Sequence, residues 1–273
     1  MPQAQLAEVA LEYECHGDPG RPALVLIRGL GTQLIDWSDS FIAHFVEKGI
    51  HVVVFDNRDA GLSSKAVDGY TLDDMASDVV GLLDHLGIAK AHLFGISMGG
   101  MIAQLVAVNH PERLASLISV MSSSGHPALP QAKPDIMALL MESAEGATEI
   151  THLSARSKAV FGSPGYPEAW PERLAAAERA YARCHCPEGV ARQMRAVIAD
   201  GDRSERLRGV RKPSLVIHDK DDPLIPWQAG AHTAEQLVTA DLVLIDGMGH
   251  NIPSALETEI AEHVLGFISQ QQS

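Results

Sequence analysis

Several features that would point to particular protein classes are scarce or missing in this 273-residue chain. Its cysteines number three, Cys15, Cys184 and Cys186, which is an odd count and too few for a disulfide framework. The run Cys184, His185 and Cys186 does not make a zinc site, because zinc needs about four well-spaced ligands and the sequence has no second cluster. We therefore expect neither structural disulfides nor a bound metal.

Positively charged residues are fewer than negatively charged ones, and long apolar runs are missing. Lys and Arg total 21 against 35 Asp and Glu, a net charge of −14, and such an acidic surface repels nucleic acids and anionic membranes. No apolar stretch approaches the roughly 20 residues that cross a bilayer, and 1–15 lacks the basic-then-apolar order of a secretion signal. We expect a cytoplasmic protein with no nucleic-acid or membrane partner. The sequence leaves its oligomeric state open, as a monomer or a homodimer.

What the chain does contain is an alternation of two patterns. Short apolar runs rich in β-branched residues predict buried strands at 23–27, 51–55, 91–94, 114–120, 214–218 and 242–245. Amphipathic stretches predict helices at 37–47, 72–86, 98–110, 226–237 and 254–269. Parallel strands need crossover connections, so the alternation predicts an α/β fold with a mostly parallel, doubly wound sheet. The more polar alternation at 6–14 predicts an antiparallel edge.

The strand patterns stop between residues 124 and 207. This segment has helical patterns broken by prolines and by a Gly- and Pro-containing cluster at 162–167. We predict a helical insertion at 124–207, placed between two strands of a core formed by 1–123 and 208–273. Such an insertion would lie over the core as a lid.

The pentapeptide Gly95-Ile96-Ser97-Met98-Gly99 fits the GxSxG pattern, in which a sharp turn presents a serine hydroxyl at the edge of a sheet. A predicted strand precedes it and a predicted helix follows it, which is the setting that the pattern requires. A serine held in a strained turn leaves no room for side chains two residues away, hence the glycines. We predict that Ser97 is a nucleophile; the alternative is a serine that merely caps the helix.

A serine nucleophile needs a general base, usually a histidine, and a carboxylate that orients it. Of the 13 histidines, His250 follows the last predicted strand and would share a sheet edge with Ser97; the alternative is a histidine near a helix start. The loop after the preceding strand offers three acids, Asp219, Asp221 and Asp222. The order Ser, Asp, His is the one expected of a doubly wound hydrolase. The pattern alone does not choose among the three aspartates.

Attack by a serine creates an oxyanion, which needs preorganised donors. The backbone N–H of Met98, directly after the nucleophile, is one candidate. The second is the N–H of Leu30, because Gly29 and Gly31 on either side let the loop bend toward a substrate. The preceding Arg28 has either a structural role or a role in binding a substrate carboxylate, and the sequence does not decide between them.

These motifs together resemble the α/β-hydrolase superfamily. The matching segments are Arg28–Gly31, Asp56–Ser63, the turn at Ser97, Asp222–Pro226 and Gly249-His250, which span nearly the whole chain outside the insertion. The resemblance implies an α/β-hydrolase fold with a helical lid. It also favours Asp222 as the acid, because the family's aspartate is followed by a proline four residues later; Asp221 is the fallback.

The chain departs from the family pattern in three places. Arg28 stands where a histidine is usual, Asp59 where a glycine usually follows Arg58, and Asp219 where a glycine usually begins the acid loop. The first departure leaves the backbone donor in place but changes its surroundings. The second implies a locally different turn.

Within the superfamily, Gly-Leu-Gly-Thr-Gln followed by Asp36-Trp37 is similar to the branch that contains aclacinomycin methylesterase, bacterial carboxylesterases and acyl-homoserine lactonases. That resemblance implies a serine esterase without cofactor, acting on a small-molecule ester or lactone, with Gly29 and Trp37 near the substrate. The alternatives are an acyl-homoserine lactonase and a ligand receptor with negligible turnover. Apolar side chains of the insertion either line an acyl pocket or pack the lid against the core: Met137, Leu139, Leu140, Met141, Phe161 and Trp170.

Overall fold

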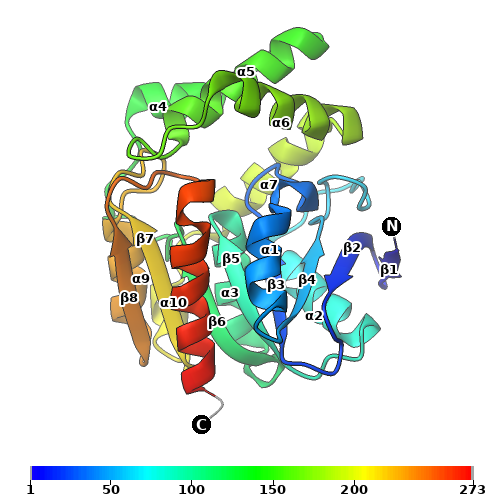
Figure 1. Cartoon of the computed structure of the whole chain (residues 1–273), viewed down its shortest axis with the longest axis vertical. Coiled ribbons are helices and arrows are strands. Elements are labelled where there is room, and N and C mark those ends of the chain that lie inside the picture. Colours follow the sequence, from blue (N-terminus) through cyan, green and yellow to red (C-terminus); the bar gives the residue numbers. More distant parts are fainter. Residues whose placement is uncertain (1, 272–273) are drawn as a thin grey trace.

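The computed structural model describes residues 2–271 of the chain. In this part of the chain, eight strands form one sheet in the order β1-β2-β4-β3-β5-β6-β7-β8, with helices on both faces and more helices at one end (Figure 1). The strands are β1 (Gln3–Gln5), β2 (Ala10–His16), β3 (Ala23–Ile27), β4 (His51–Phe55), β5 (Ala91–Ile96), β6 (Leu114–Val120), β7 (Ser214–Asp219) and β8 (Ala240–Ile245).

The sheet is parallel from β4 to β8 and antiparallel at its first two strands. All six strands predicted from apolar runs are present, some longer by one or two residues. The prediction of a strand over 6–14 is only partly right. Leu6 donates a backbone hydrogen bond to Val9 in a turn, and the pairing strand begins at Ala10.

Ten α-helices are formed by the described residues. They are α1 (Asp39–Val46), α2 (Leu72–His85), α3 (Met98–Asn109), α4 (Pro134–Leu140), α5 (Ala147–Phe161), α6 (Trp170–Arg183), α7 (Pro187–Asp200), α8 (Ser204–Leu207), α9 (Gln228–Gln236) and α10 (Glu257–Gln270). Phe41 of α1 and Ile260 of α10 belong to the apolar core on one face of the sheet, whereas Val79 of α2 and Ile102 of α3 belong to the core on the other face. No helix in the described range is long and apolar enough to cross a membrane.

Helices α4 to α8 form a helical insertion between β6 and β7, and α4, α5 and α6 lie across one end of the sheet (Figure 1). Ion pairs attach the insertion to the core. Among them, Arg183 Nη1 lies 2.7 Å from Asp56 Oδ2, and Arg192 Nε lies 2.8 Å from Asp59 Oδ2. Asp59, at the position where the family usually has a glycine, has a φ of 70°. Asp59 therefore keeps the left-handed backbone conformation of the turn, and its side chain binds Arg192 of the insertion.

Candidate active site

Ser97 lies between the end of β5 and the start of α3, with φ 55° and ψ −122°. A positive φ is costly for a residue with a side chain, and it presents the hydroxyl at the carboxyl edge of the sheet. A Cβ on Gly95 would collide with the carbonyl of Gly99, and a Cβ on Gly99 would collide with the carbonyl of Ile27. The glycines on both sides of Ser97 are thus required by packing.

Ser97, His250 and Asp222 come from three separate strand ends and form one hydrogen-bonded chain. His250 Nε2 lies 3.0 Å from Ser97 Oγ, and His250 Nδ1 lies 2.6 Å from Asp222 Oδ2. The backbone N–H groups of Leu224 and Ile225 donate to the other Asp222 oxygen at 2.7 and 2.9 Å. Burial alone would raise the pKa of Asp222, but the charge and hydrogen bond of His250 outweigh burial and lower this pKa below its ordinary value.

Asp221 is not part of the hydrogen-bonded series formed by Ser97, His250 and Asp222. It is exposed, and its carboxylate accepts a hydrogen bond from Gly247 N at 2.9 Å. Of the three aspartates in this loop, only Asp222 is hydrogen-bonded to His250.

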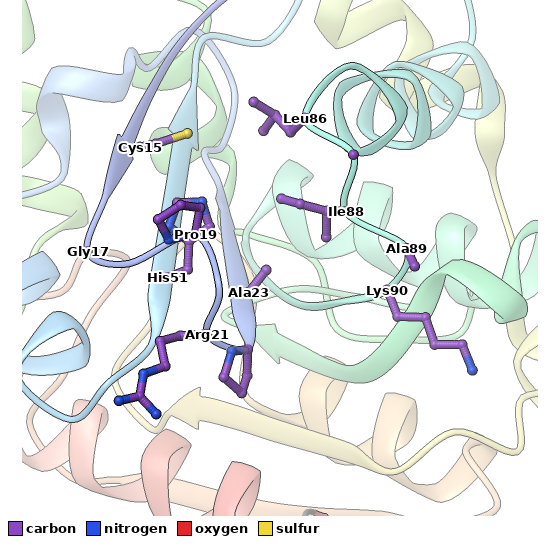
Figure 2. Close-up of a pocket in the computed structure, with 12 residues that line it drawn as sticks. Cys15, Gly17, Pro19, Arg21, Ala23, His51, Leu86, Ile88, Ala89 and Lys90 are labelled. Atoms are coloured by element: carbon purple, nitrogen blue, oxygen red, sulfur yellow. The ribbon is translucent and has the colours of Figure 1, made fainter.

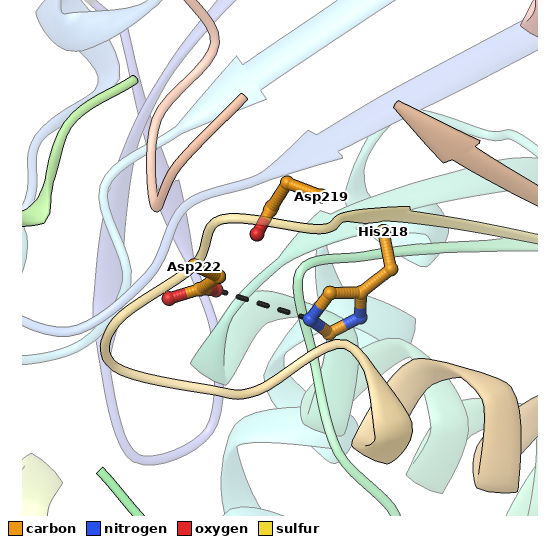
Figure 3. A group of neighbouring side chains, drawn as sticks. All are labelled: His218, Asp219 and Asp222. Atoms are coloured by element: carbon orange, nitrogen blue, oxygen red, sulfur yellow. Dashed lines mark ion pairs between the residues drawn. The ribbon is translucent and has the colours of Figure 1, made fainter. Parts of the chain in front are cut away.

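Asp219 is the third acid of the loop and is fully buried. It forms a cluster with His218 and Asp222, in which one nitrogen or oxygen atom from each side chain lies within 4.8 Å of the other two. The Asp219 carboxyl points toward Asp222 (Figure 3). Neither Asp219 oxygen has a hydrogen-bond partner among the described residues. Burial and the charge of Asp222 raise the pKa of Asp219 well above its ordinary value. Both Asp222 oxygens are already engaged, so the three residues do not present three free ligands to a metal.

The loop that carries His250 is bound to the insertion. His250 N donates to the carbonyl of Phe161 at 2.6 Å, and Gly249 N donates to Ser163 Oγ at 3.0 Å. Ser163 Oγ in turn donates to Asn251 Oδ1 at 2.7 Å. Neither Ser163 nor the Phe161 carbonyl is predicted from the sequence as part of the site. Backbone carbonyls carry no sequence signal, and Ser163 was visible only as part of a Gly- and Pro-containing cluster.

Leu30 and Met98 both line the cavity into which Ser97 opens. Met98 is the first residue of α3, so its N–H has no partner within the helix. Gly29 approaches the nucleophile closely, since a Cβ there would lie 3.1 Å from Ser97 Cβ. Next in the same loop, Gly31 has a φ of 66° and donates its N–H to Gln193 of α7 at 2.8 Å. The insertion therefore also holds the loop proposed to bind the oxyanion.

The cavity has a volume of about 670 Å³. Trp37 is part of its wall, as expected, and so are Arg28 and three of the six apolar insertion residues considered: Met137, Leu140 and Phe161. The other three lie outside the lining, and two of them, Met141 and Trp170, are exposed to solvent. Of the two alternatives left open for the six residues, lining the pocket therefore applies to the first three and not to Leu139, Met141 and Trp170.

A second hollow is lined by Cys15, His51 and Lys90 among others (Figure 2). His51 and Lys90 lie at or just before the amino ends of β4 and β5. Since Ser97 follows the carboxyl end of β5, this hollow opens at the opposite edge of the sheet and takes no part in the site.

The fold also matches a known family. A family model described as alpha/beta hydrolase fold matches residues 22–254. The chain belongs to the alpha/beta hydrolase family.

Relatives with assigned names cover most of the chain. The 3-oxoadipate enol-lactonase 2 of Acinetobacter baylyi is 34% identical over 88% of this chain and 86% of its own length. The rhodomycin D methylesterase of Streptomyces peucetius is 30% identical over 93% of each chain. A solved structure of an N-acyl homoserine lactone degrading enzyme is 26% identical, has a TM-score of 0.73, and covers 97% of this chain and 100% of its own. This protein is thus an alpha/beta hydrolase whose relatives include enzymes named for esters and lactones.

Proposed function

We propose that the protein is a serine hydrolase that cleaves carboxylic esters of small molecules through an acyl-enzyme intermediate. The observation that carries the proposal is the continuous contact from Ser97 Oγ through His250 to Asp222. A serine hydroxyl attacks only when a base takes its proton, and a buried carboxylate keeps that base in the right orientation and tautomer. All three groups are in place at one rim of the sheet.

The reaction runs in two halves. As Ser97 attacks the acyl carbon, its proton passes to His250, and the N–H groups of Leu30 and Met98 hold the developing oxyanion. Protonated His250 then gives the proton to the departing alcohol, which leaves an acyl ester on Ser97. Water, deprotonated by His250, attacks that ester; the bond from the acyl carbon to Ser97 Oγ then breaks, His250 returns the proton to Ser97, and the acid is released. Every proton moves between groups of this chain, substrate and water, so the proposed reaction needs no cofactor.

The segment 124–207 acts in this proposal as a lid. It contributes Met137, Leu140 and Phe161 to the wall of the cavity that contains Ser97, and so adds apolar surface to it. Such a wall suits the apolar part of a small ester.

Lactone hydrolysis is the second candidate, because two of the named relatives are an enol-lactonase and an N-acyl homoserine lactone degrading enzyme. The same residues would open a lactone, with the released alcohol remaining attached to the acid. A receptor with the same fold is the alternative from another class, and it would bind its ligand tightly with negligible turnover.

The test is a panel of p-nitrophenyl esters, methyl esters and acyl lactones assayed with the wild type and Ser97→Ala. We expect ester or lactone turnover in the wild type and a loss of at least about a thousandfold in Ser97→Ala. Ser77→Ala, an exposed serine on α2, is the control and should keep full activity. Activity retained in Ser97→Ala would overturn the assignment, and tight binding without turnover would favour the receptor.

A further inference from the structure

Arg28 lies directly after β3, at the start of the loop that carries Leu30, and its side chain lines the cavity that contains Ser97. The guanidinium carbon lies over the Trp37 ring, 4.5 Å from the centroid. Its Nε donates to Thr32 Oγ1 at 3.3 Å. The guanidinium therefore has a fixed position in the wall of the cavity that Ser97 also lines.

Arg28 has no carboxylate within ion-pair distance among the described residues, whereas four other buried or half-buried arginines each pair with one. The pairs are Arg58 with Asp78, Arg183 with Asp56, Arg192 with Asp59 and Arg203 with Asp200. A guanidinium withdrawn from water is costly unless an anion compensates it. Arg28 is half-buried and has no such anion in the described protein, so its guanidinium is free to meet one in the cavity.

The acidic side chains of the same cavity already have other partners. Asp36 accepts from Gln33 N at 2.8 Å and lies 3.7 Å from Lys158 Nζ. Glu257 accepts from two serine hydroxyls of the α1 start, and Glu168 accepts from an asparagine amide at 3.3 Å. None of these carboxylates lies in direct contact with Arg28.

Burial lowers the pKa of Arg28 below its ordinary value, and the nearby charge of Asp36 offsets part of that effect. An arginine nevertheless stays protonated at neutral pH. A positive charge therefore remains in the cavity wall, where an incoming anion would be attracted more strongly than in water.

A second donor in the same wall is also unused. The indole N–H of Trp37 is buried and has no hydrogen-bond acceptor among the described residues. Buried N–H groups normally have partners, so this cavity wall has a second polar group that the described residues leave unsatisfied.

We propose that Arg28 binds a carboxylate carried by the substrate, so that the preferred substrates are esters or lactones with a free carboxylate in addition to the reacting carbonyl. This inference rests on the hydrolase function proposed above. The planar guanidinium matches a carboxylate with two parallel hydrogen bonds. A purely structural Arg28, holding Trp37 by the cation–π contact alone, would give no dependence on substrate charge.

The test compares esters that differ in charge but little in size. Mono-p-nitrophenyl glutarate and p-nitrophenyl pentanoate differ on the acyl side, and 4-acetoxybenzoate and its methyl ester differ on the alcohol side. We expect the wild type to favour the anionic member of at least one pair. Arg28→Gln should lower kcat/KM for that anionic ester by about thirtyfold or more and change its neutral partner less than about threefold.

Two further variants separate charge from geometry. Arg28→Lys keeps the charge but loses the planar fork, so its kcat/KM for the anionic ester should fall between those of the wild type and Arg28→Gln. Arg211→Gln, on the surface and away from the cavity, controls for the loss of one positive charge and should leave both esters of each pair unchanged. Equal losses for anionic and neutral esters in Arg28→Gln, or no anionic preference in the wild type, would overturn the inference.

A binding measurement keeps this inference distinct from the proposed function. Calorimetry with Ser97→Ala and monomethyl glutarate should detect binding that disappears in Ser97→Ala/Arg28→Gln. If the wild type hydrolyses no ester but this binding difference is found, the hydrolase proposal fails and the anion subsite stands. If no binding difference is found, the subsite fails whether or not esters are hydrolysed.

Discussion

The α carbon of Gly99 packs against the carbonyl group of Ile27 so closely that no side chain fits between them. Ile27 ends β3 and Gly99 lies in the first turn of α3, so this contact brings the loop of Leu30 against the turn of Ser97. The position of the nucleophile and the position of one proposed oxyanion donor are therefore set by the same backbone contact.

We predict that Gly99→Ala is destabilised by about 2 kcal/mol or more and loses esterase activity, because the new methyl group forces β3 and α3 apart. Gly266→Ala is the matched control. Gly266 lies within α10, and a Cβ there meets no atom within 4 Å. Since glycine is unfavourable inside a helix, this substitution should stabilise the protein by about 0.5 to 1 kcal/mol. Urea unfolding measures both, and a Gly99→Ala protein as stable as the wild type would contradict the packing argument.

We predict that Asp222→Asn lowers kcat by about 10⁴-fold while the protein remains folded, since an amide no longer stabilises a protonated His250 or holds the productive tautomer. Asp221→Asn removes the neighbouring carboxylate, which does not touch His250, and should retain nearly full activity. Initial rates on one p-nitrophenyl ester compare the two variants. A larger loss in Asp221→Asn would transfer the orienting role to that residue.

The buried Asp219 carboxyl should make the protein less stable as the pH rises. Its pKa is raised in the folded state relative to the usual value of 3.8, so the folded protein holds a proton that the unfolded chain releases. The stabilisation that this proton provides is complete below about pH 4 and is lost as the pH rises through the folded pKa. Asp219→Asn removes this contribution. Its free energy of unfolding should therefore improve relative to the wild type between pH 4 and pH 8.

Chemical denaturation at several pH values measures this difference. Asp221→Asn, which changes an exposed carboxylate of the same loop, should show no comparable trend. The prediction concerns the trend with pH, because any cost of burying the new amide is the same at every pH. A difference between Asp219→Asn and wild type that stays constant from pH 4 to pH 8 would show that Asp219 is ionised in the folded protein.

Ser163→Ala should weaken the hold of the insertion on the loop of His250. The variant loses the acceptor for Gly249 N and the donor to Asn251 while the Phe161 carbonyl still binds His250 N. We expect kcat to fall by about three- to thirtyfold, with a smaller change in KM, because a less well positioned base slows proton transfer more than it weakens binding. Ser163→Thr, which keeps the hydroxyl, should recover part of the rate. Unchanged kcat in Ser163→Ala would show that the Phe161 contact alone positions the base.

The sequence predicted those parts of the molecule whose cause is local. The glycines around Ser97 and the apolar runs of the sheet have steric and solvation causes that act within a few residues, and both are found where expected. The choice between Asp221 and Asp222 required the family resemblance, because it depends on how the loop folds back so that Leu224 and Ile225 bind one aspartate oxygen.

The sequence does not predict contacts between segments that lie far apart in the chain. The bond from His250 N to the Phe161 carbonyl joins residues 89 positions apart and involves only backbone atoms. Residues 6–9 form a turn, although their alternation of polar and apolar side chains is typical of a strand. Which apolar residues of the insertion face the cavity depends on how α4 and α6 pack, and the hydrophobic pattern of Met141 and Trp170 does not specify that packing.

The attachment of the His250 loop to residues 161–163 constrains how this protein can be engineered or can diverge. Grafting the helical segment of a relative onto this core would remove the backbone support of the imidazole unless the graft supplied an equivalent carbonyl and hydroxyl. A chimaera can therefore retain every residue of the Ser97 turn and still be slow. Recombination libraries made to change substrate preference should therefore take residues 161–163 and the 247–251 loop from the same parent protein.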